Sequence, residues 1–231
     1  MGQGRGIVTF WHQIGVFFTT ESNWTGQDGI PQRLWLQVQL SAAVIAVAAL
    51  VGVGVGFLLG HFGRGAVVAV NAANAARAVP SLALLTLLAI TPAIGLAWNG
   101  FLASFITLAA LGIPPVLTNA YVGMREVDRE VIEAARASGM TGWQSFRRVE
   151  GRLAVPLAVA GIRTAAVEVV ATGTLAAYIS YNDLGGFIIS GFDTNNTVET
   201  FSGAIVVAVL AMATDLLLAA AYRFATPPAL R

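Results

Sequence analysis

Cysteine and lysine are both absent from this chain of 231 residues, and charged side chains make up only 11% of it. Without cysteine the chain can form neither disulfides nor thiolate metal sites. A soluble domain carries about 25% charged residues, so the low charge argues against a soluble fold. The basic residues are all arginine, which we interpret as a coding bias, and the net charge of +1 gives no indication of nucleic-acid binding.

Catalytic patterns are missing as well. The sequence contains no phosphate-binding glycine loop, no paired carboxylates in a plausible site and no nucleophile accompanied by a base. Its two histidines, His12 and His61, have no neighbours with metal-ligand spacing. We therefore expect no catalytic residue, no metal site and no cofactor held by this chain.

Long uncharged runs dominate what is present. The chain is 56% hydrophobic with a mean hydropathy of +0.73. No charged residue occurs between Arg33 and Arg64, or between Arg77 and Arg125. A helix needs about 20 apolar residues to cross a bilayer core. The pattern predicts an all-α polytopic membrane protein with a single membrane domain.

The apolar runs predict five transmembrane helices, at residues 34–60, 66–96, 101–121, 153–179 and 201–222. The second run is interrupted by Pro80 and Pro92, and we interpret it as a span kinked near Pro80, with a broken helix as the alternative. Glycines in the first span give it a small-residue face suited to close helix packing; they are Gly52, Gly54, Gly56 and Gly60. The third span is expected to bend at Pro114 and Pro115.

Residues 1–33 are expected to form an external N-terminal segment that precedes the membrane domain at 34–222. Residues 6–18 are too short to span, but their apolar side chains recur at helical spacing. This favours an interfacial helix lying on the membrane over a signal peptide. Residues 223–231 form a short tail, and residues 180–200 form a polar, glycine-rich loop with an apolar patch at 187–189.

A charged insert separates the third and fourth spans, from Arg125 to Arg152. Such a segment must lie outside the bilayer. Residues 127–138 are rich in helix formers, and Gly139 stands where a helix-ending residue with positive φ is wanted. Thr141 and Gln144 have the spacing of a capping box, which starts a second helix. The pattern predicts two short helices joined at a glycine.

Apolar side chains line one face of each predicted short helix. They are Val127, Val131, Ala134 and Ala135 in the first, and Met140, Trp143, Phe146 and Val149 in the second. A stiff helix pair with apolar groups on one face and many arginines in water has the form of a docking element.

The placement of arginine predicts the orientation. Under a five-span count the six arginines between 125 and 152 share one side with Arg64, Arg223 and Arg231, whereas only Arg5 and Arg33 fall on the other. The positive-inside rule then puts the insert in the cytoplasm. Residues 1–32, 97–100 and 180–200 are expected outside, and residues 61–65, 122–152 and 223–231 inside.

In the insert, Glu133-Ala134-Ala135 is followed by three residues and then Gly139. This spacing resembles the "EAA" loop of the membrane subunits of bacterial ABC importers. The family pattern continues after nine residues with Ile-x-Leu-Pro. Here residues 149–152 read Val-Glu-Gly-Arg, so the Leu-Pro is absent, and Val155-Pro156 follows four residues later.

Further characteristic strings lie at residues 78–85, 113–128, 161–165 and 183–186. They resemble the osmoprotectant branch of these permeases, which carry glycine betaine, carnitine, choline and proline betaine. The resemblance covers about residues 35–222 and implies the type I ABC importer (MetI-like) fold with five core helices. It also implies a bacterial cell membrane location, two membrane subunits (a homo- or heterodimer), two cytoplasmic ATPases that hold ATP and Mg²⁺, and an external substrate-binding protein.

On this resemblance, the insert at 122–152 is the coupling loop that docks on the ATPase. The residues expected to serve it are Glu133, Ala134, Ala135, Gly139, Met140, Trp143 and Phe146. Glu133 would orient or tether the helix pair, and Gly139 would permit the sharp reversal.

The fourth span is expected to line the translocation pathway, with Glu168, Thr172 and Arg163 as candidate pathway residues. Glu168 lies deep in the span, where carboxylates face a cavity or a partner, and pairing with another subunit is the alternative. Arg163 is near enough to the helix start to snorkel to the interface.

Three other functions remain open at this stage. An ABC permease for another small solute, such as an amino acid, would share the coupling loop. A proton-coupled carrier could use Glu168, Asp215 and Arg77 as a relay, but it would have no ATPase for the insert to contact. A purely structural membrane subunit of another complex is the third.

Overall fold

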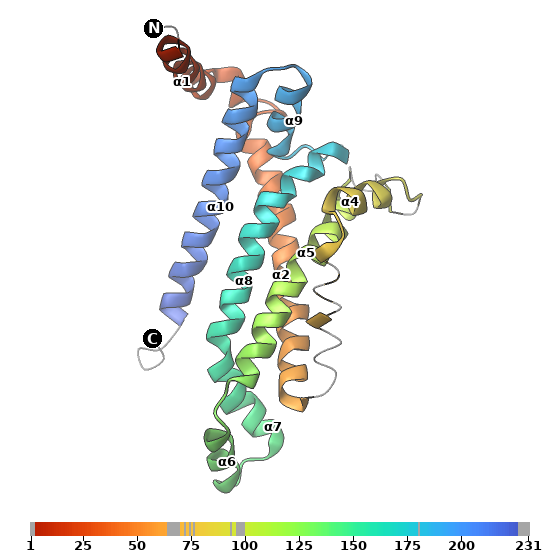
Figure 1. The fold of residues 1–231 in the computed structure, drawn as a ribbon, viewed down its shortest axis with the longest axis vertical. Coiled ribbons are helices and arrows are strands. Elements are labelled where there is room, and N and C mark those ends of the chain that lie inside the picture. Colours follow the sequence, from red (N-terminus) through yellow and green to blue (C-terminus); the bar gives the residue numbers. More distant parts are fainter. Residues whose placement is uncertain are drawn as a thin grey trace. The chain divides into compact units, whose positions relative to one another are not determined.

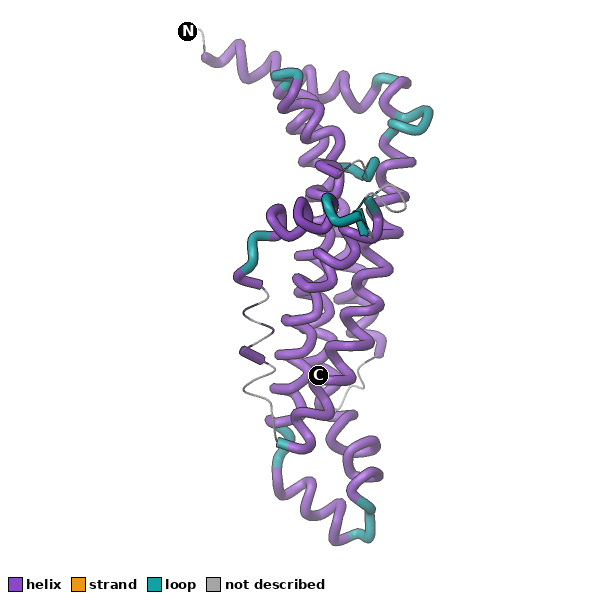
Figure 2. Tube along the Cα trace, turned by 90° about the vertical axis from the view of Figure 1, so that its right-hand side faces the viewer, coloured by secondary structure: helices purple, strands orange, loops and turns teal. Residues whose placement is uncertain are grey.

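A computed structural model describes residues 3–225, apart from 64–69, 72, 74, 76, 93, 96–99 and 180. In this described part the chain consists of helices and loops without a strand (Figures 1 and 2). The α-helices are α1 Gln3–Thr19, α2 Ile30–Phe62, α4 Ser81–Ala89, α5 Phe101–Arg125, α6 Arg129–Ala137, α7 Gly142–Ser145, α8 Gly151–Gly173, α9 Gly185–Asp193 and α10 Thr197–Ala225. Short turns of other helix types complete them at η1 Glu21–Asn23, η2 Phe146–Glu150 and η3 Thr174–Ile179.

Four described helices are long and apolar enough to cross a membrane: Ile30–Phe62, Phe101–Arg125, Gly142–Ile179 and Thr197–Arg223. They coincide with four of the five predicted spans, which confirms the all-α polytopic class. Parts of the predicted second span, at 66–69, 72, 74, 76, 93 and 96, lie outside the described residues. Where it is described, the helix stops after Ala78 and α4 begins at Ser81. The helix is therefore interrupted at Pro80, because proline cannot donate the helical hydrogen bond. This agrees with the broken helix that the sequence left as the alternative to a kinked span.

The chain divides into two compact units, and the first comprises Met1–Ala42, Leu82–Thr107 and Val170–Ala213. Its core joins the start of α2, the α9 region and α10 through Ile30, Leu184, Phe187 and Val207. Phe17 of α1 packs on this core, with its ring 5.6 Å from that of Phe187. The predicted N-terminal helix is thus present, and part of its apolar side contacts protein.

Helix α9 was not foreseen, because residues 180–200 read as a polar loop. The backbone N–H of Gly185 donates to the side-chain Oδ1 of Asp183 at 2.8 Å, which satisfies a free donor where α9 begins. Phe187 is only 6% exposed in the first-unit core, so burial of an aromatic ring fixes the helix. The apolar patch at 187–189 was the one sequence signal for it.

Arg33 fastens this region to the start of α2. Its guanidinium donates to the backbone carbonyl of Asp183 at 3.1 Å and to the carboxylate of Asp28 at 3.2 Å. It also lies 4.7 Å from the centre of the Phe187 ring, within cation–π range. One arginine therefore ties the loop before α2 to the loop before α9.

The second unit comprises Ala43–Ser81, Leu108–Val169 and Thr214–Arg231. Here α2 and α5 approach closely through the predicted glycine face (Figure 1). A Cβ added to Gly56 would lie 2.7 Å from the Ala120 Cβ, and one on Gly52 would lie 2.7 Å from the Val116 Cβ. Nothing lies within 4 Å of a Cβ on Gly54. The small-residue face is therefore confirmed, with Gly54 outside it.

Helix α8 joins the same packing. Gly161 meets the Asn119 side chain and the Pro115 carbonyl of α5, and Ala165 shares a buried cluster with Ala48 and Val116. Helix α5 continues through both of its prolines, Pro114 and Pro115. The second unit thus contains three closely packed helices, α2, α5 and α8, that carry the charged insert.

Candidate functional site

The first helix of the charged insert forms where the sequence predicts it. Asp128 caps α6 by accepting a hydrogen bond from the backbone N–H of Glu130 at 2.9 Å. After α6 ends at Ala137, Gly139 has φ +85°. This left-handed conformation is the one expected for the residue that reverses the chain, and only glycine adopts it without strain.

The second helix begins with the predicted capping box. The backbone N–H of Gln144 donates to Thr141 Oγ1 at 3.3 Å, and the backbone N–H of Thr141 donates to Gln144 Oε1 at 2.9 Å. Two backbone donors at this helix start are thereby satisfied. Helix α7 follows at once, so the reversal between α6 and α7 takes only a few residues.

The end of the insert differs from the prediction. Helix α7 does not stop before a separate fourth span at Leu153; it continues through the π-helical turn η2 into α8, giving a helical stretch from Gly142 to Ile179. The physical reason lies at 151–152, where the family pattern has Leu-Pro. Gly151 and Arg152 keep their backbone N–H groups, so helical hydrogen bonding is not interrupted there.

The apolar faces of the helix pair are partly exposed. Trp143 is 65% exposed and stacks on Phe146, with 5.1 Å between the ring centroids. In α6 the predicted apolar face is split: Ala135 is buried, while Val131 is 42% exposed and Ala134 is exposed. Tertiary packing within the chain therefore covers Ala135 and leaves Val131 and Ala134 of the predicted apolar face exposed.

A buried polar cluster joins the insert to the end of α2. Nδ1 of His61 lies 2.7 Å from Glu150 Oε2, and the Ser145 hydroxyl donates to Glu150 Oε1 at 2.9 Å. The Glu150 side chain is only 5% exposed, and these two partners satisfy both of its oxygens away from water. The His61 ring also meets the edge of Phe146 at 5.0 Å. Sequence reasoning missed this cluster, since nothing in the pattern links residues 61 and 150.

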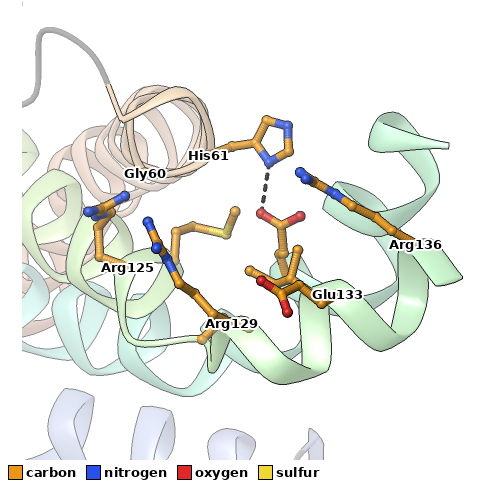
Figure 3. Close-up of a pocket in the computed structure, with 10 residues that line it drawn as sticks. Gly60, His61, Arg125, Arg129, Glu133 and Arg136 are labelled. Carbon is orange, nitrogen blue, oxygen red and sulfur yellow. Dashed lines mark hydrogen bonds and ion pairs between the residues drawn. The ribbon is translucent and has the colours of Figure 1, made fainter. Parts of the chain in front are cut away.

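A pocket of about 320 Å³ lies beside this cluster (Figure 3). It is lined by Gly60, His61, Met124, Arg125, Val127, Arg129, Ile132, Glu133, Arg136 and Glu150. Figure 3 shows Arg125 and Arg129 on one side of the pocket and Arg136 reaching in from the other. Of the predicted coupling residues, only Glu133 lines this pocket.

The charged groups predicted within the membrane form two ion pairs. Arg163 makes a forked contact with Asp215, at 2.8 and 3.0 Å from one nitrogen, and Arg77 contacts both oxygens of Glu168 at 3.0 and 3.2 Å. Arg163 is thus paired within the chain, where the sequence suggested that it reaches the interface alone. The prediction missed both pairs because their members lie 52 and 91 residues apart.

Thr172 lies one turn beyond Glu168 on α8 and is half-buried. The three pathway candidates therefore share one helix. Two of them are neutralised by a partner of opposite charge, which lowers the cost of keeping charge inside a membrane.

Two neighbouring titratable groups in the described loop before α9 have strongly raised pKa values, Asp183 and Tyr181. Asp183, in the loop before α9, is fully buried, and burial raises its pKa to about 7 against the opposing effects of the Gly185 hydrogen bond and the Arg33 charge. Its Oδ2 atom has no hydrogen-bond partner among the described residues. Burial together with the Asp183 charge also raises the pKa of Tyr181 to about 12.

Comparisons with known proteins agree with this geometry. Residues 32–227 match the family described as binding-protein-dependent transport system inner membrane component. The chain is 36% identical over 226 residues to the carnitine transport permease protein OpuCB of Listeria monocytogenes, covering 97% of this chain and 95% of that one. It is 32% identical over 197 residues to the glycine betaine/carnitine/choline transport system permease protein OpuCB of Bacillus subtilis, covering 85% and 87%.

A solved structure shares the fold. An inward-facing conformation of the MetNI methionine ABC transporter superposes with a TM-score of 0.71 at 20% identity, covering 84% of this chain and 94% of that one. This likeness confirms the expected type I importer fold of the membrane subunit. With the family match over most of the chain and the relatives above 30% identity, the chain belongs to the inner membrane components of binding-protein-dependent transport systems.

Proposed function

We propose that this chain is the permease subunit of an ATP-driven importer for quaternary ammonium osmolytes such as glycine betaine, carnitine and choline. The observation that carries the proposal is the helix pair α6–α7, which reverses at a left-handed Gly139 and presents an exposed Trp143. The names of the curated relatives support the class of solute.

The helix pair is suited to transmit movement from an ATPase. Because α7 continues into α8 through η2, a displacement of Trp143 passes directly into a transmembrane helix. The bond between Glu150 and His61 passes it on to the end of α2. In this proposal Met140, Trp143, Phe146 and the exposed Ala134 contact the ATPase, Ala135 packs α6 in place, Glu133 orients the pair and Gly139 provides the reversal.

The partners follow from this role. ATP and Mg²⁺ are held by two cytoplasmic ATPase subunits, a second permease subunit completes the pathway, and an external binding protein delivers the solute. The insert lies in the cytoplasm of a bacterial cell and the N-terminus lies outside, as the arginine distribution favours. Residues 1–33 form an external segment whose helix α1 touches the membrane surface with its exposed Trp11.

The translocation pathway runs along α8 past Arg163, Glu168 and Thr172. The Arg77–Glu168 pair leaves no net charge there, which suits a zwitterion because a strong charge site would trap it. Both carboxylates of the alternative proton relay, Glu168 and Asp215, are already bonded to arginines. This pairing favours passive lining over proton transfer, and solute selectivity then resides in the binding protein.

Reconstitution tests the proposal. The chain would be placed in liposomes with its ATPase and binding protein, and uptake of labelled glycine betaine, carnitine and choline would be measured with and without ATP. We expect ATP-dependent uptake of at least one of them. Accumulation of amino acids or metal ions alone would exclude the osmolyte assignment while leaving the importer assignment in place.

Trp143→Ala tests the coupling contact. We expect binding of the ATPase to weaken at least about tenfold, because buried aromatic side chains dominate interfaces. Trp35→Ala is the matched control, since Trp35 is 56% exposed but lies on α2 outside the insert. Equal ATPase binding by both variants in a pull-down would remove Trp143 from the interface.

Glu168→Gln tests the pathway assignment. We expect a modest reduction of uptake without its loss, because the amide can still accept a hydrogen bond from Arg77. Uptake, ATP hydrolysis and complex assembly would be measured together. Complete loss of uptake with assembly and hydrolysis intact would show that the carboxylate is essential and would favour the proton relay.

A further inference from the structure

The pocket of Figure 3 holds more positive charge than its own acidic groups can neutralise. Arg125, Arg129 and Arg136 line it. The acidic lining residues are Glu133 and Glu150, and both oxygens of Glu150 already take part in hydrogen bonds with His61 and Ser145. Within the described residues none of the three arginine guanidinium groups has a hydrogen bond or ion pair. Three guanidinium groups therefore face two carboxylates, which leaves an excess of positive charge in the pocket.

Helical geometry separates this charged face from the face offered to the ATPase. Arg129, Ile132, Glu133 and Arg136 follow the i, i+3, i+4, i+7 pattern of a single helix face, and all of them line the pocket. At about 100° per residue, Val131 points roughly 200° away from Arg129. The exposed apolar side of α6 and its arginines thus face different surroundings.

The position of the pocket at the ends of two transmembrane helices indicates what surrounds the arginines of α6. Gly60 and His61 belong to the last turn of the α2 span, and Met124 and Arg125 to the last turn of the α5 span. The ends of transmembrane helices lie in the polar headgroup layer. Phosphate groups are the anions of that layer, and the planar fork of arginine matches their oxygens.

We propose that this pocket is a binding site for a phosphate-bearing anion, held by Arg125, Arg129 and Arg136. The anion is either the headgroup of an acidic phospholipid or a soluble phosphate compound. Bound there, it would bridge α6 to the ends of α2 and α5 and so brace the coupling loop from behind. The proposal rests on the function above only in placing the pocket at the membrane's cytoplasmic surface.

The test compares two double substitutions in the full chain. Arg129→Gln with Arg136→Gln removes two pocket arginines, and Arg147→Gln with Arg148→Gln removes the same charge from exposed residues of the insert that do not line the pocket. Each protein is reconstituted in nanodiscs of phosphatidylcholine mixed with phosphatidylglycerol, and retained lipid is identified by native mass spectrometry. In detergent without lipid, binding of inorganic phosphate is measured by calorimetry.

For a lipid ligand we expect the unaltered chain and the 147/148 variant to retain phosphatidylglycerol in preference to phosphatidylcholine. The 129/136 variant should retain it at least about tenfold less, the factor for one lost hydrogen bond to a charged group. Phosphate binding that depends on Arg129 and Arg136, without lipid preference, would support the soluble source.

If the two double variants retained equal amounts of phosphatidylglycerol and no phosphate binding were measured, the proposed anion site would be refuted. Loss of ATPase binding in the 129/136 variant, again without anion binding, would also overturn it and assign the arginines to a protein interface. None of these measurements depends on transport. The uptake assay therefore tests the osmolyte assignment independently of the anion site.

Discussion

At the scale of single residues, Gly139 is where sequence and structure agree most closely. Its φ of +85° lies in the left-handed region, and a Cβ there would meet no atom within 4 Å. Backbone strain is therefore the sole cost of a side chain at this position. That cost is about 1–2 kcal/mol for an ordinary residue, and a β-branched one is worse.

Gly139→Val should abolish transport while the protein still accumulates in the membrane, because the reversal between α6 and α7 is distorted. Gly142→Val is the control, since Gly142 also has free space around its Cβ position but has no positive φ. Uptake and membrane abundance would be measured for both. Unimpaired uptake by Gly139→Val would refute the role of the reversal.

Asp183 predicts a pH dependence of stability. Its pKa is about 7 in the folded chain and 3.8 in the reference state, so between these values the folded state holds a proton that the unfolded state releases. Stability therefore falls as pH rises from about 4 to about 7 and then levels off, by roughly 4 kcal/mol at most.

Asp183→Asn should flatten this dependence, because the amide stays neutral and its oxygen can still accept from the Gly185 N–H. The measurement is the Tm of the purified chain from pH 5 to pH 8.5. Between pH 5 and about pH 7 the unaltered chain should lose thermal stability more steeply than the variant does, and above that range the two curves should run parallel. Curves that run parallel over the whole range would show that Asp183 is ionised throughout.

At the scale of elements, the contact between α2 and α5 depends on glycine at every fourth position. Gly56→Ala should lower stability by about 1–3 kcal/mol, because the new Cβ would lie 2.7 Å from both the Ala120 Cβ and the Leu117 carbonyl oxygen. The helices would have to separate to accept it.

Gly54→Ala is the matched control on the same helix, with open space at its Cβ position. It should be neutral or slightly stabilising, since alanine favours a helix more than glycine does. Thermal unfolding in detergent should show a drop of a few degrees for Gly56→Ala alone. The same Tm for both variants would contradict the close packing.

At the scale of the whole molecule, the prediction concerns orientation. The native chain has no cysteine, so single cysteines can be labelled without background. Ala137 and Gln27 are exposed, whereas the side chain of Ser145 is fully buried and would react poorly. A membrane-impermeant thiol reagent applied to intact cells should label Gln27→Cys and leave Ala137→Cys unlabelled until the cells are opened. Labelling of Ala137→Cys in intact cells would show that the insert lies outside the cell and would contradict the predicted topology.

The sequence by itself determined the features that depend on local chemistry. Apolar runs between charged ends define spans because a bilayer excludes charge, and this placed the helices containing residues 34–60, 101–121, 153–179 and 201–222. The turn at Gly139 and the capping box at Thr141 were predictable because both are decided within a few residues. The EAA pattern then led to the family.

Only the tertiary structure decided which distant side chains meet. The bonds of Glu150 with His61, Arg163 with Asp215, and Arg77 with Glu168 cross between helices, and helical periodicity says which face a residue occupies without saying what lies opposite. The same holds for α9, whose start depends on Asp183 and on burial of Phe187. The arginine pocket also forms only when α6 lies beside the ends of α2 and α5. Packing of these helices brings together charged side chains that are separated in the sequence.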